Sequence, residues 1–105
     1  MVAKLIQPKN ILEIGTFTGY ATLCLAEGLA SEGHIDTLDN NEELYDLQRD
    51  FFDRSPWGKQ IEQHLGNALD IIPSLDRKYD LVFIDADKEN YARYFELIID
   101  KMNRG

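Results

Sequence analysis

A chain of 105 residues, 44% hydrophobic and 29% charged, has the size and composition of one small globular domain. Its formal net charge of −8 argues against a broad electrostatic surface for nucleic acid, although it does not exclude an RNA substrate. It contains no apolar run of membrane-spanning length and no recognisable secretory signal, and its single cysteine, Cys24, cannot form an internal disulfide. We therefore expect a cytoplasmic protein with no membrane partner.

The first part of the chain predicts a strand, a helix and a second strand. The apolar run Ile11–Ile14 is typical of a short buried strand. Thr18 is placed to cap a helix, so we expect a helix over 18–30, with Gly33 at its exit. His34–Leu38 predicts the second strand, which ends at Asp39.

A second helix follows, and its start and one face can be read from the sequence. Asn40 or Asn41 is expected to cap it, and acidic residues in the first turn favour the helix N-terminus. Apolar residues fall on one face at helical spacing, namely Leu44, Leu47 and Phe51. This pattern predicts an amphipathic helix.

The second half continues the alternation. Ser55–Gly58 predicts a turn, Ile61–Leu65 a third strand, and Ala68–Leu75 a short helical segment interrupted by Pro73. The continuous apolar run Leu81–Ile84 is typical of a central parallel strand buried on both faces.

The last element expected is an amphipathic helix. Its apolar residues recur at three- and four-residue steps, namely Tyr91, Tyr94, Phe95, Ile98, Ile99 and Met102. The whole pattern, with strands and helices alternating and no repeats or linkers, predicts an α/β fold with a doubly wound parallel sheet.

The turn after the first strand carries the most informative motif, Glu13-Ile14-Gly15-Thr16-Phe17-Thr18-Gly19-Tyr20. A strand that runs into a glycine turn and then a helix lets backbone N–H groups and the positive helix end meet an anionic or zwitterionic ligand. A Cβ at Gly15 would occupy the ligand's space. The motif does not read G-x-G-x-x-G, which argues against a nicotinamide dehydrogenase.

Residues 13–20 resemble the first motif of the small, metal-dependent, S-adenosylmethionine-using O-methyltransferases, the group that includes catechol and caffeoyl-CoA O-methyltransferases. The run Ile84-Asp85-Ala86-Asp87-Lys88-Glu89-Asn90-Tyr91 resembles a second family motif, and Asp39 and Gly66–Leu69 match two further positions in the right order. The resemblance implies a Rossmann-like doubly wound parallel sheet of the class I methyltransferase type, with strand order 3-2-1-4. It also implies that residues 1–105 are a partial methyltransferase domain, truncated to about four strands, that lacks the family's N-terminal helices and later strands.

The resemblance implies that one edge of the sheet binds S-adenosylmethionine. The residues that match are Glu13, Gly15, Thr16, Gly19, Tyr20, Ala21, Asp39, Asn67, Ala68 and Asp85. In the family, the residue matching Asp39 binds the ribose, that matching Glu13 lies beside the methionine moiety, and those matching Asn67 and Ala68 lie near the adenine. A helix-capping role is the alternative for Asp39, and a buried ion pair for Glu13. Ala21 stands where many relatives carry serine.

Asp85 and Lys88 match the family's catalytic positions. Asp85 corresponds to a ligand of a divalent cation, normally Mg²⁺, which holds two adjacent substrate oxygens and acidifies a hydroxyl. Lys88 corresponds to the general base. The alternative is that Asp85 and Asp87 cap the next helix and Lys88 is a surface residue. The family's two other metal ligands would lie after Gly105, so a non-catalytic cofactor-binding or assembly fragment is a second hypothesis.

The resemblance implies a small hydroxylated acceptor, such as a catechol-like phenol or a phenolic CoA ester, while a hydroxylated tRNA uridine is not excluded. An exposed edge on the fourth strand predicts self-association or a homo-oligomer. A receiver-type regulatory domain is a weaker alternative, because it needs paired acids where Gly15-Thr16 stand.

The remaining polar and aromatic candidates are expected to have structural roles. His34 and His64 are isolated at strand edges with no second histidine or cysteine at ligand spacing, which favours packing over metal binding. Cys24 is interpreted as a small apolar residue between helix and sheet, and Trp57 as a cover for the sheet edge.

Overall fold

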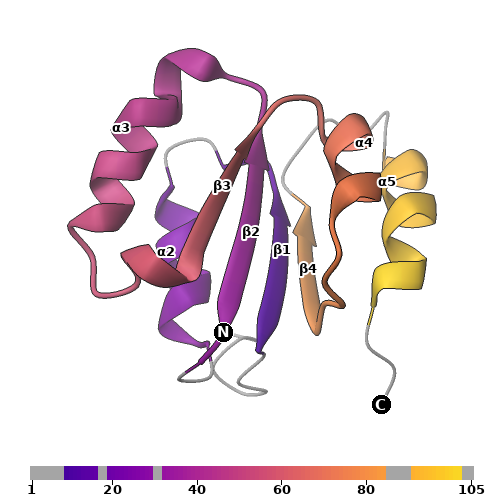
Figure 1. The fold of residues 1–105 in the computed structure, drawn as a ribbon, viewed down its shortest axis with the longest axis horizontal. Coiled ribbons are helices and arrows are strands. Elements are labelled where there is room, and N and C mark those ends of the chain that lie inside the picture. The colour runs from indigo at the N-terminus through magenta and orange to yellow at the C-terminus, as the bar shows by residue number, and fades with distance from the viewer. Residues whose placement is uncertain (1–8, 17–18, 30–31, 85–90, 103–105) are drawn as a thin grey trace.

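A computed structural model describes residues 9–16, 19–29, 32–84 and 91–102. Four strands form one sheet, namely β1 (Asn10–Ile14), β2 (His34–Asp39), β3 (Ile61–Leu65) and β4 (Leu81–Ile84). Their order is β3-β2-β1-β4, and all three pairs are parallel (Figure 1). The predicted order 3-2-1-4 is confirmed.

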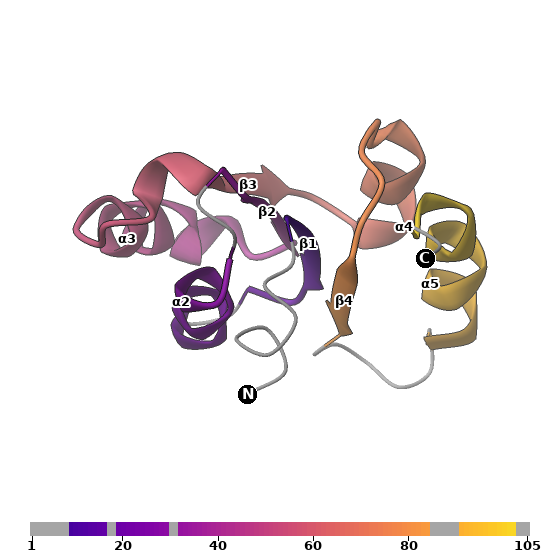
Figure 2. The same cartoon turned by 90° about the horizontal axis from the view of Figure 1, so that it is seen from below.

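Helices cover both faces of this sheet (Figure 2). One face carries α2 (Tyr20–Glu27) and α3 (Glu42–Asp53), which is followed by the 3₁₀ turn η1 (Gly58–Gln60). The other face carries α4 (Ala68–Ile71), the 3₁₀ turn η2 (Ile72–Ser74), α5 (Tyr91–Ile98) and the 3₁₀ turn η4 (Ile99–Lys101). The fold is therefore the doubly wound α/β arrangement expected from the sequence.

Alternation along the strands divides the core between the two faces. Leu12 and Leu38 belong to an apolar cluster that α4 and α5 cover, whereas Ile11 and Ile35 belong to a second cluster under α2 and α3. Trp57 packs against the second cluster. The central strands β1 and β2 carry buried apolar residues on both faces because helices remove both faces from water.

Helix α2 differs from the prediction at both ends. Its N-cap is Gly19, with φ of 86°, whereas the predicted cap Thr18 lies outside the described residues. Its C-cap is Gly28, so the helix is shorter than the predicted span 18–30 and does not leave at Gly33. Glycine can adopt the left-handed conformation at low cost, which explains why it starts this helix without a side-chain cap.

Helix α3 has the predicted cap but a different buried face. The Asn41 side chain accepts a hydrogen bond from the Glu43 backbone N–H, at 3.0 Å. Gln48 and Phe52 are buried, whereas Leu47 is 67% and Phe51 40% exposed. The apolar stripe read from the sequence therefore points largely to solvent in the described structure.

The strand β4 is an outer strand of the described sheet, and α5 packs on one face of that sheet. The prediction that β4 is buried on both faces is wrong for the described chain, where β4 pairs with β1 alone and Phe83 is 39% exposed. On α5, Tyr94 and Ile98 are buried while Phe95 is 58% exposed. Within the described ranges, no helix is long and apolar enough to cross a membrane.

Candidate functional site

The carboxyl ends of β1, β2 and β3 meet at one edge of the sheet. Ile14 pairs with Leu38, and Asp39 pairs with Leu65, so the three strands end in register. The segments that follow these strands therefore emerge side by side. In open parallel sheets, this is the edge at which ligands bind.

The turn after β1 is bonded to β2. The N–H groups of Gly15 and Thr16 both donate to the Leu38 carbonyl, at 2.7 and 3.2 Å. Both N–H groups therefore have an acceptor within the protein, and the contact of this turn with a ligand stays a prediction. Gly15 has φ of 100°, a conformation that strains other L-residues, so the backbone itself requires glycine here.

Glu13 lies behind this turn and is fully buried on the face that α2 covers. Its Oε1 accepts hydrogen bonds from the hydroxyls of Thr22 on α2 and Thr37 on β2, the latter at 2.6 Å. Because Thr37 donates its hydrogen to Glu13, the Thr16 hydroxyl donates to Thr37, at 2.7 Å. These hydroxyls reduce the cost of burying the carboxylate and join β1, β2, α2 and the turn. The sequence analysis did not single out Thr22 or Thr37.

Asp39 at the end of β2 is half-buried and also contacts the start of α3. Its Oδ2 accepts a hydrogen bond from Gln48 Nε2 at 3.1 Å, and its Oδ1 accepts one from the Asn41 N–H at 3.3 Å. The bond from the Asn41 N–H fits the helix-capping role that the sequence analysis gave as the alternative for Asp39. Gln48 is only 3% exposed, so it holds the Asp39 carboxylate in a fixed orientation at the sheet edge.

The segment after β3 begins a short helix. Gly66 adopts φ of 144° and donates its N–H to the Asp39 carbonyl at 2.9 Å, which keeps this segment beside the end of β2. Asn67 caps α4, because its Oδ1 accepts the Leu69 N–H at 2.9 Å. Ala68 is 9% exposed. The Asn67 side chain therefore has a helix-capping role at the place where the resemblance implies adenine.

Gly19, Tyr20 and Ala21 form the start of α2 on the other side of the turn. The Gly19 N–H donates to the Thr16 carbonyl at 2.9 Å, and the Tyr20 side chain is 71% exposed. A Cβ on Gly19 would lie 2.8 Å from Phe52 Cε1, so close packing of α2 on α3 also requires glycine at this position.

Asp85 and Lys88 lie outside the described residues. Asp85 directly follows Ile84, whose backbone pairs with Ile14 in the sheet register. β4 therefore ends level with β1 at the same edge as the other candidate residues.

The expectation that His34 and His64 are isolated is wrong. Both imidazoles lie against the buried carboxylate of Asp36, on the opposite face of the sheet from Glu13. Sequence spacing did not show this, because the two histidines come from different strands and only the pairing of β2 with β3 brings them together.

The sheet order, the glycine turn after β1 and the acid at the end of β2 define a Rossmann-like domain of the kind that binds nucleotide-derived cofactors. The O-methyltransferase family model matches residues 1–105, and the chain belongs to this family.

Curated relatives support the same conclusion. Caffeoyl-CoA O-methyltransferase 5 of Nicotiana tabacum is 38% identical over 111 residues, which cover 100% of this chain and 46% of that protein. Catechol O-methyltransferase of Niastella koreensis is 37% identical over 100 residues, which cover 91% of this chain and 45% of that protein. The chain thus spans less than half the length of these relatives.

Solved structures agree in fold. An O-methyltransferase from Bacillus cereus in complex with SAH matches with a TM-score of 0.93 and 36% identity, over 99% of this chain and 49% of that one. The O-methyltransferase TomG from Streptomyces achromogenes, in complex with SAM, matches with a TM-score of 0.93 and 34% identity, over 99% and 48%. The Rossmann-like fold class predicted from the sequence is confirmed.

Proposed function

We propose that this chain forms the cofactor-binding core of an O-methyltransferase, which transfers a methyl group from S-adenosylmethionine to a hydroxyl of a small phenolic or catechol-like acceptor. The observation that carries the proposal is the common edge at which the Gly15 turn, Asp39 and the Asn67–Ala68 segment emerge in register. Two structural neighbours described with SAM or SAH support the choice of cofactor.

The described residues fit such a cofactor chemically. The Asp39 carboxylate is half-buried and held by Gln48, so it offers oriented acceptor oxygens to the two hydroxyls of a ribose. Glu13 places a buried carboxyl group behind the Gly15 turn, and its oxygens are acceptors that suit a cationic group nearby. The small side chain of Ala68 leaves room for a planar base. The cofactor itself supplies the electrophilic methyl group.

Asp85 and Lys88 are the residues that we propose act on the methyl acceptor. A carboxylate oxygen is the type of ligand that Mg²⁺ prefers, so Asp85 would hold the cation by one oxygen. The cation would supply acidification of a bound hydroxyl. Lys88 would take the proton that the acceptor hydroxyl loses.

Calorimetric titration of the chain with S-adenosylhomocysteine, with and without Mg²⁺, tests cofactor binding. We expect binding that weakens by about tenfold or more in Asp39→Ala, because a charged hydrogen-bond acceptor is lost. Asp50→Ala is the matched control, since it removes an equal charge from the exposed pair with Arg54 on α3 and should leave affinity unchanged. Tight NADH binding with no response to S-adenosylhomocysteine would contradict the proposal.

The second candidate function is cofactor binding without methyl transfer. The chain matches less than half the length of each relative, so we treat cofactor binding and methyl transfer as separate proposals. If Asp85 is joined by no other protein ligand, the cation cannot align two substrate oxygens, and positional advantages of up to about 7–11 kcal/mol are lost. We therefore expect no useful Mg²⁺-dependent methylation of catechol by the 105 residues alone. Robust turnover that Asp85→Ala abolishes would favour the catalytic reading.

A further inference from the structure

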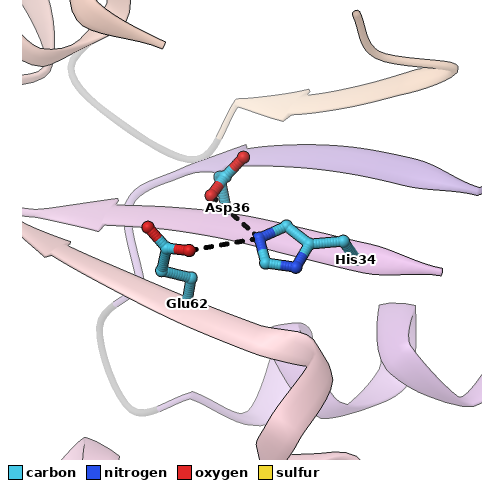
Figure 3. A group of neighbouring side chains, drawn as sticks. All are labelled: His34, Asp36 and Glu62. Atoms are coloured by element: carbon cyan, nitrogen blue, oxygen red, sulfur yellow. Dashed lines mark hydrogen bonds and ion pairs between the residues drawn. The ribbon is translucent and has the colours of Figure 1, made fainter. Parts of the chain in front are cut away.

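A cluster of two imidazoles and two carboxylates lies on the face of β2 and β3 opposite Glu13. His34 and Asp36 are two residues apart on β2, and Glu62 and His64 are two residues apart on β3, so each pair leaves its strand on one face. Asp36 is the register partner of Glu62, which brings the two pairs together. Figure 3 shows three of these side chains converging, with the His34 ring directed at both carboxylates.

The ligand atoms of this cluster are spaced as a metal ion would require. His64 Nε2 lies 2.9 Å and His34 Nε2 3.2 Å from Asp36 Oδ1. Glu62 reaches both rings with different oxygens, since His34 Nε2 lies 3.5 Å from Oε1 and His64 Nε2 lies 3.5 Å from Oε2. Tetrahedral Zn²⁺ with bonds of about 2.0–2.1 Å separates its ligand atoms by roughly 3.3 Å. These four separations, from 2.9 to 3.5 Å, lie around that value, but the mutual 4.8 Å spacing holds for His34, Asp36 and Glu62, so His64 must shift to become the fourth ligand.

The direction of the ring nitrogens also favours a bound metal ion. Both Nε2 atoms approach one oxygen, Asp36 Oδ1, and without a metal each must donate its hydrogen to that atom. A cation at the centre of the cluster would take the nitrogen lone pairs after these protons leave. Two imidazole nitrogens and two carboxylates are a donor set that suits Zn²⁺ and other transition metals better than Mg²⁺.

Neighbouring groups hold Asp36 in the orientation that such a site needs. The Tyr79 hydroxyl donates to Oδ2 at 2.6 Å, and Arg77 Nε lies 3.5 Å from the same oxygen, which leaves Oδ1 facing the imidazoles. Burial raises the pKa of Asp36, but hydrogen bonds from His34, His64 and Tyr79 outweigh burial and hold it well below its ordinary value of 3.8. Asp36 is therefore an ionised carboxylate.

An open cleft of about 430 Å³ gives solvent a route to the cluster. Asp36, Glu62 and His64 line it together with residues 74–77. The side chains of His34 and His64 are 18% and 20% exposed, so the cluster is partly covered without being sealed. Arg77 is 45% exposed and can turn into solvent when a cation neutralises Asp36.

We propose that His34, Asp36, Glu62 and His64 form a binding site for a divalent transition-metal ion, with Zn²⁺ as the preferred occupant. Atoms of His34, Asp36 and Glu62 already lie within 4.8 Å of one another. The site is separate from the proposed Mg²⁺ position at Asp85, because it lies within β2 and β3 rather than beyond the end of β4. A bound ion would join the outer strand β3 to β2, which is a structural role.

Zinc titration of the untagged chain in excess Mg²⁺ tests the proposal, since Mg²⁺ occupies sites made of oxygen ligands alone. The sequence has two histidines, so histidine-dependent binding must involve His34 or His64. We expect one ion per chain and a melting temperature that rises with Zn²⁺ concentration. His34→Gln and His64→Gln each keep a hydrogen-bond donor for Asp36 and should each weaken binding by about tenfold or more.

Two further measurements distinguish the loss of a metal ligand from a loss of folding. Glu62→Gln alters a side chain that is 53% exposed, so it should fold normally and still weaken Zn²⁺ binding, whereas Cys24→Ser should not. Co²⁺ bound to the wild-type chain should give the visible absorption of tetrahedral coordination, and His64→Gln should lose it. Undiminished Zn²⁺ affinity in both histidine variants, or in Glu62→Gln, would overturn the proposal.

Discussion

Two buried carboxylates lie on opposite faces of neighbouring strands and are stabilised by different kinds of donor. Glu13 on β1 is 0% exposed and accepts hydrogen bonds from the hydroxyls of Thr22 and Thr37. Asp36 on β2 is 2% exposed and accepts from two imidazoles and from the Tyr79 hydroxyl. The burial is nearly equal, but the donors to Glu13 are hydroxyls, whereas Asp36 also contacts two imidazoles, of which His64 has a raised pKa because of its hydrogen bond to Asp36.

We call the surroundings of Glu13 the fixed side, because their donors are hydroxyls, and the surroundings of Asp36 the adjustable side, because they include imidazoles. The hydroxyl groups that bond to Glu13 keep the same charge across the physiological pH range. Imidazoles change their charge near neutrality and are also metal ligands, so the surroundings of Asp36 respond to protons and, in our proposal, to Zn²⁺. The fixed carboxylate lies beside the candidate cofactor edge, where positioning matters most.

The largest change in the free energy of unfolding is expected from removing the Asp36 carboxylate on the adjustable side. Asp36→Ala leaves the buried Tyr79 hydroxyl and both imidazoles without their acceptor, so we expect a loss of about 3 kcal/mol in the free energy of unfolding. Urea unfolding in the presence of a chelator measures this loss. Asp76→Ala removes an exposed acid from the same cleft and should change stability by less than about 0.5 kcal/mol. Equal effects of the two variants would show that the cluster contributes nothing.

A smaller loss is expected on the fixed side. Thr22→Val removes a hydroxyl that donates to buried Glu13 while keeping the shape of the side chain, and should cost about 2 kcal/mol, because a buried acceptor loses one of its donors. Thr22→Ser keeps the donor and should retain most of that stability. Urea unfolding measures both variants, and equal losses in Thr22→Val and Thr22→Ser would show that the hydroxyl donor contributes nothing.

The pH dependence of stability should come from the adjustable side. The hydrogen bond to Asp36 is the main cause that raises the pKa of His64 above 6.5, although burial opposes it. The folded state therefore holds this proton more tightly, and the stabilisation is complete below pH 6.5 and is lost as pH rises through the raised pKa. Because the pKa of Asp36 is lowered, its contribution is lost as pH falls below 3.8.

Chemical unfolding of the metal-free chain between pH 5 and pH 9 measures this dependence. His64→Gln should flatten the decline above pH 6.5. The other titratable or charged groups that face the pair are His34, Glu62, Arg77 and Tyr79. An unchanged slope in His64→Gln would assign the dependence to one of these groups instead.

The smallest effect concerns the two outer strands of the described sheet. β3 carries the polar residues 62–64, whereas β4 is apolar throughout and exposes 39% of Phe83. Unpaired apolar edges recruit other chains, so we expect weak self-association through β4. Sedimentation at high micromolar concentration should show Phe83→Lys shifted towards monomer, and Leu65→Lys on β3 should leave the distribution unchanged. A monomeric wild-type chain would contradict this expectation.

Local signals in the sequence predicted the order of elements and most strand bounds well. Ile61–Leu65 has the predicted bounds, and Asn41, one of the two predicted candidates, caps α3, because apolar runs and cap residues act over a few neighbouring positions. The N-cap at Gly19 was missed, and the requirement for glycine there comes partly from the Phe52 ring on another helix. The buried face of α3 was missed for the same reason: Leu47 and Phe51 have the right period, but Gln48 and Phe52 meet the sheet.

The sequence by itself determined the α/β class, the parallel order through its family motifs, and the glycine turn beside an acid that ends the next strand. Only the tertiary structure decided which donors surround each buried carboxylate. Thr37 reaches Glu13 and His64 reaches Asp36 across strand pairs, and these contacts depend on register between segments that are far apart in the chain. Short-range patterns contain no information about register, because shifting a strand by one residue keeps its composition and reverses the face of every side chain.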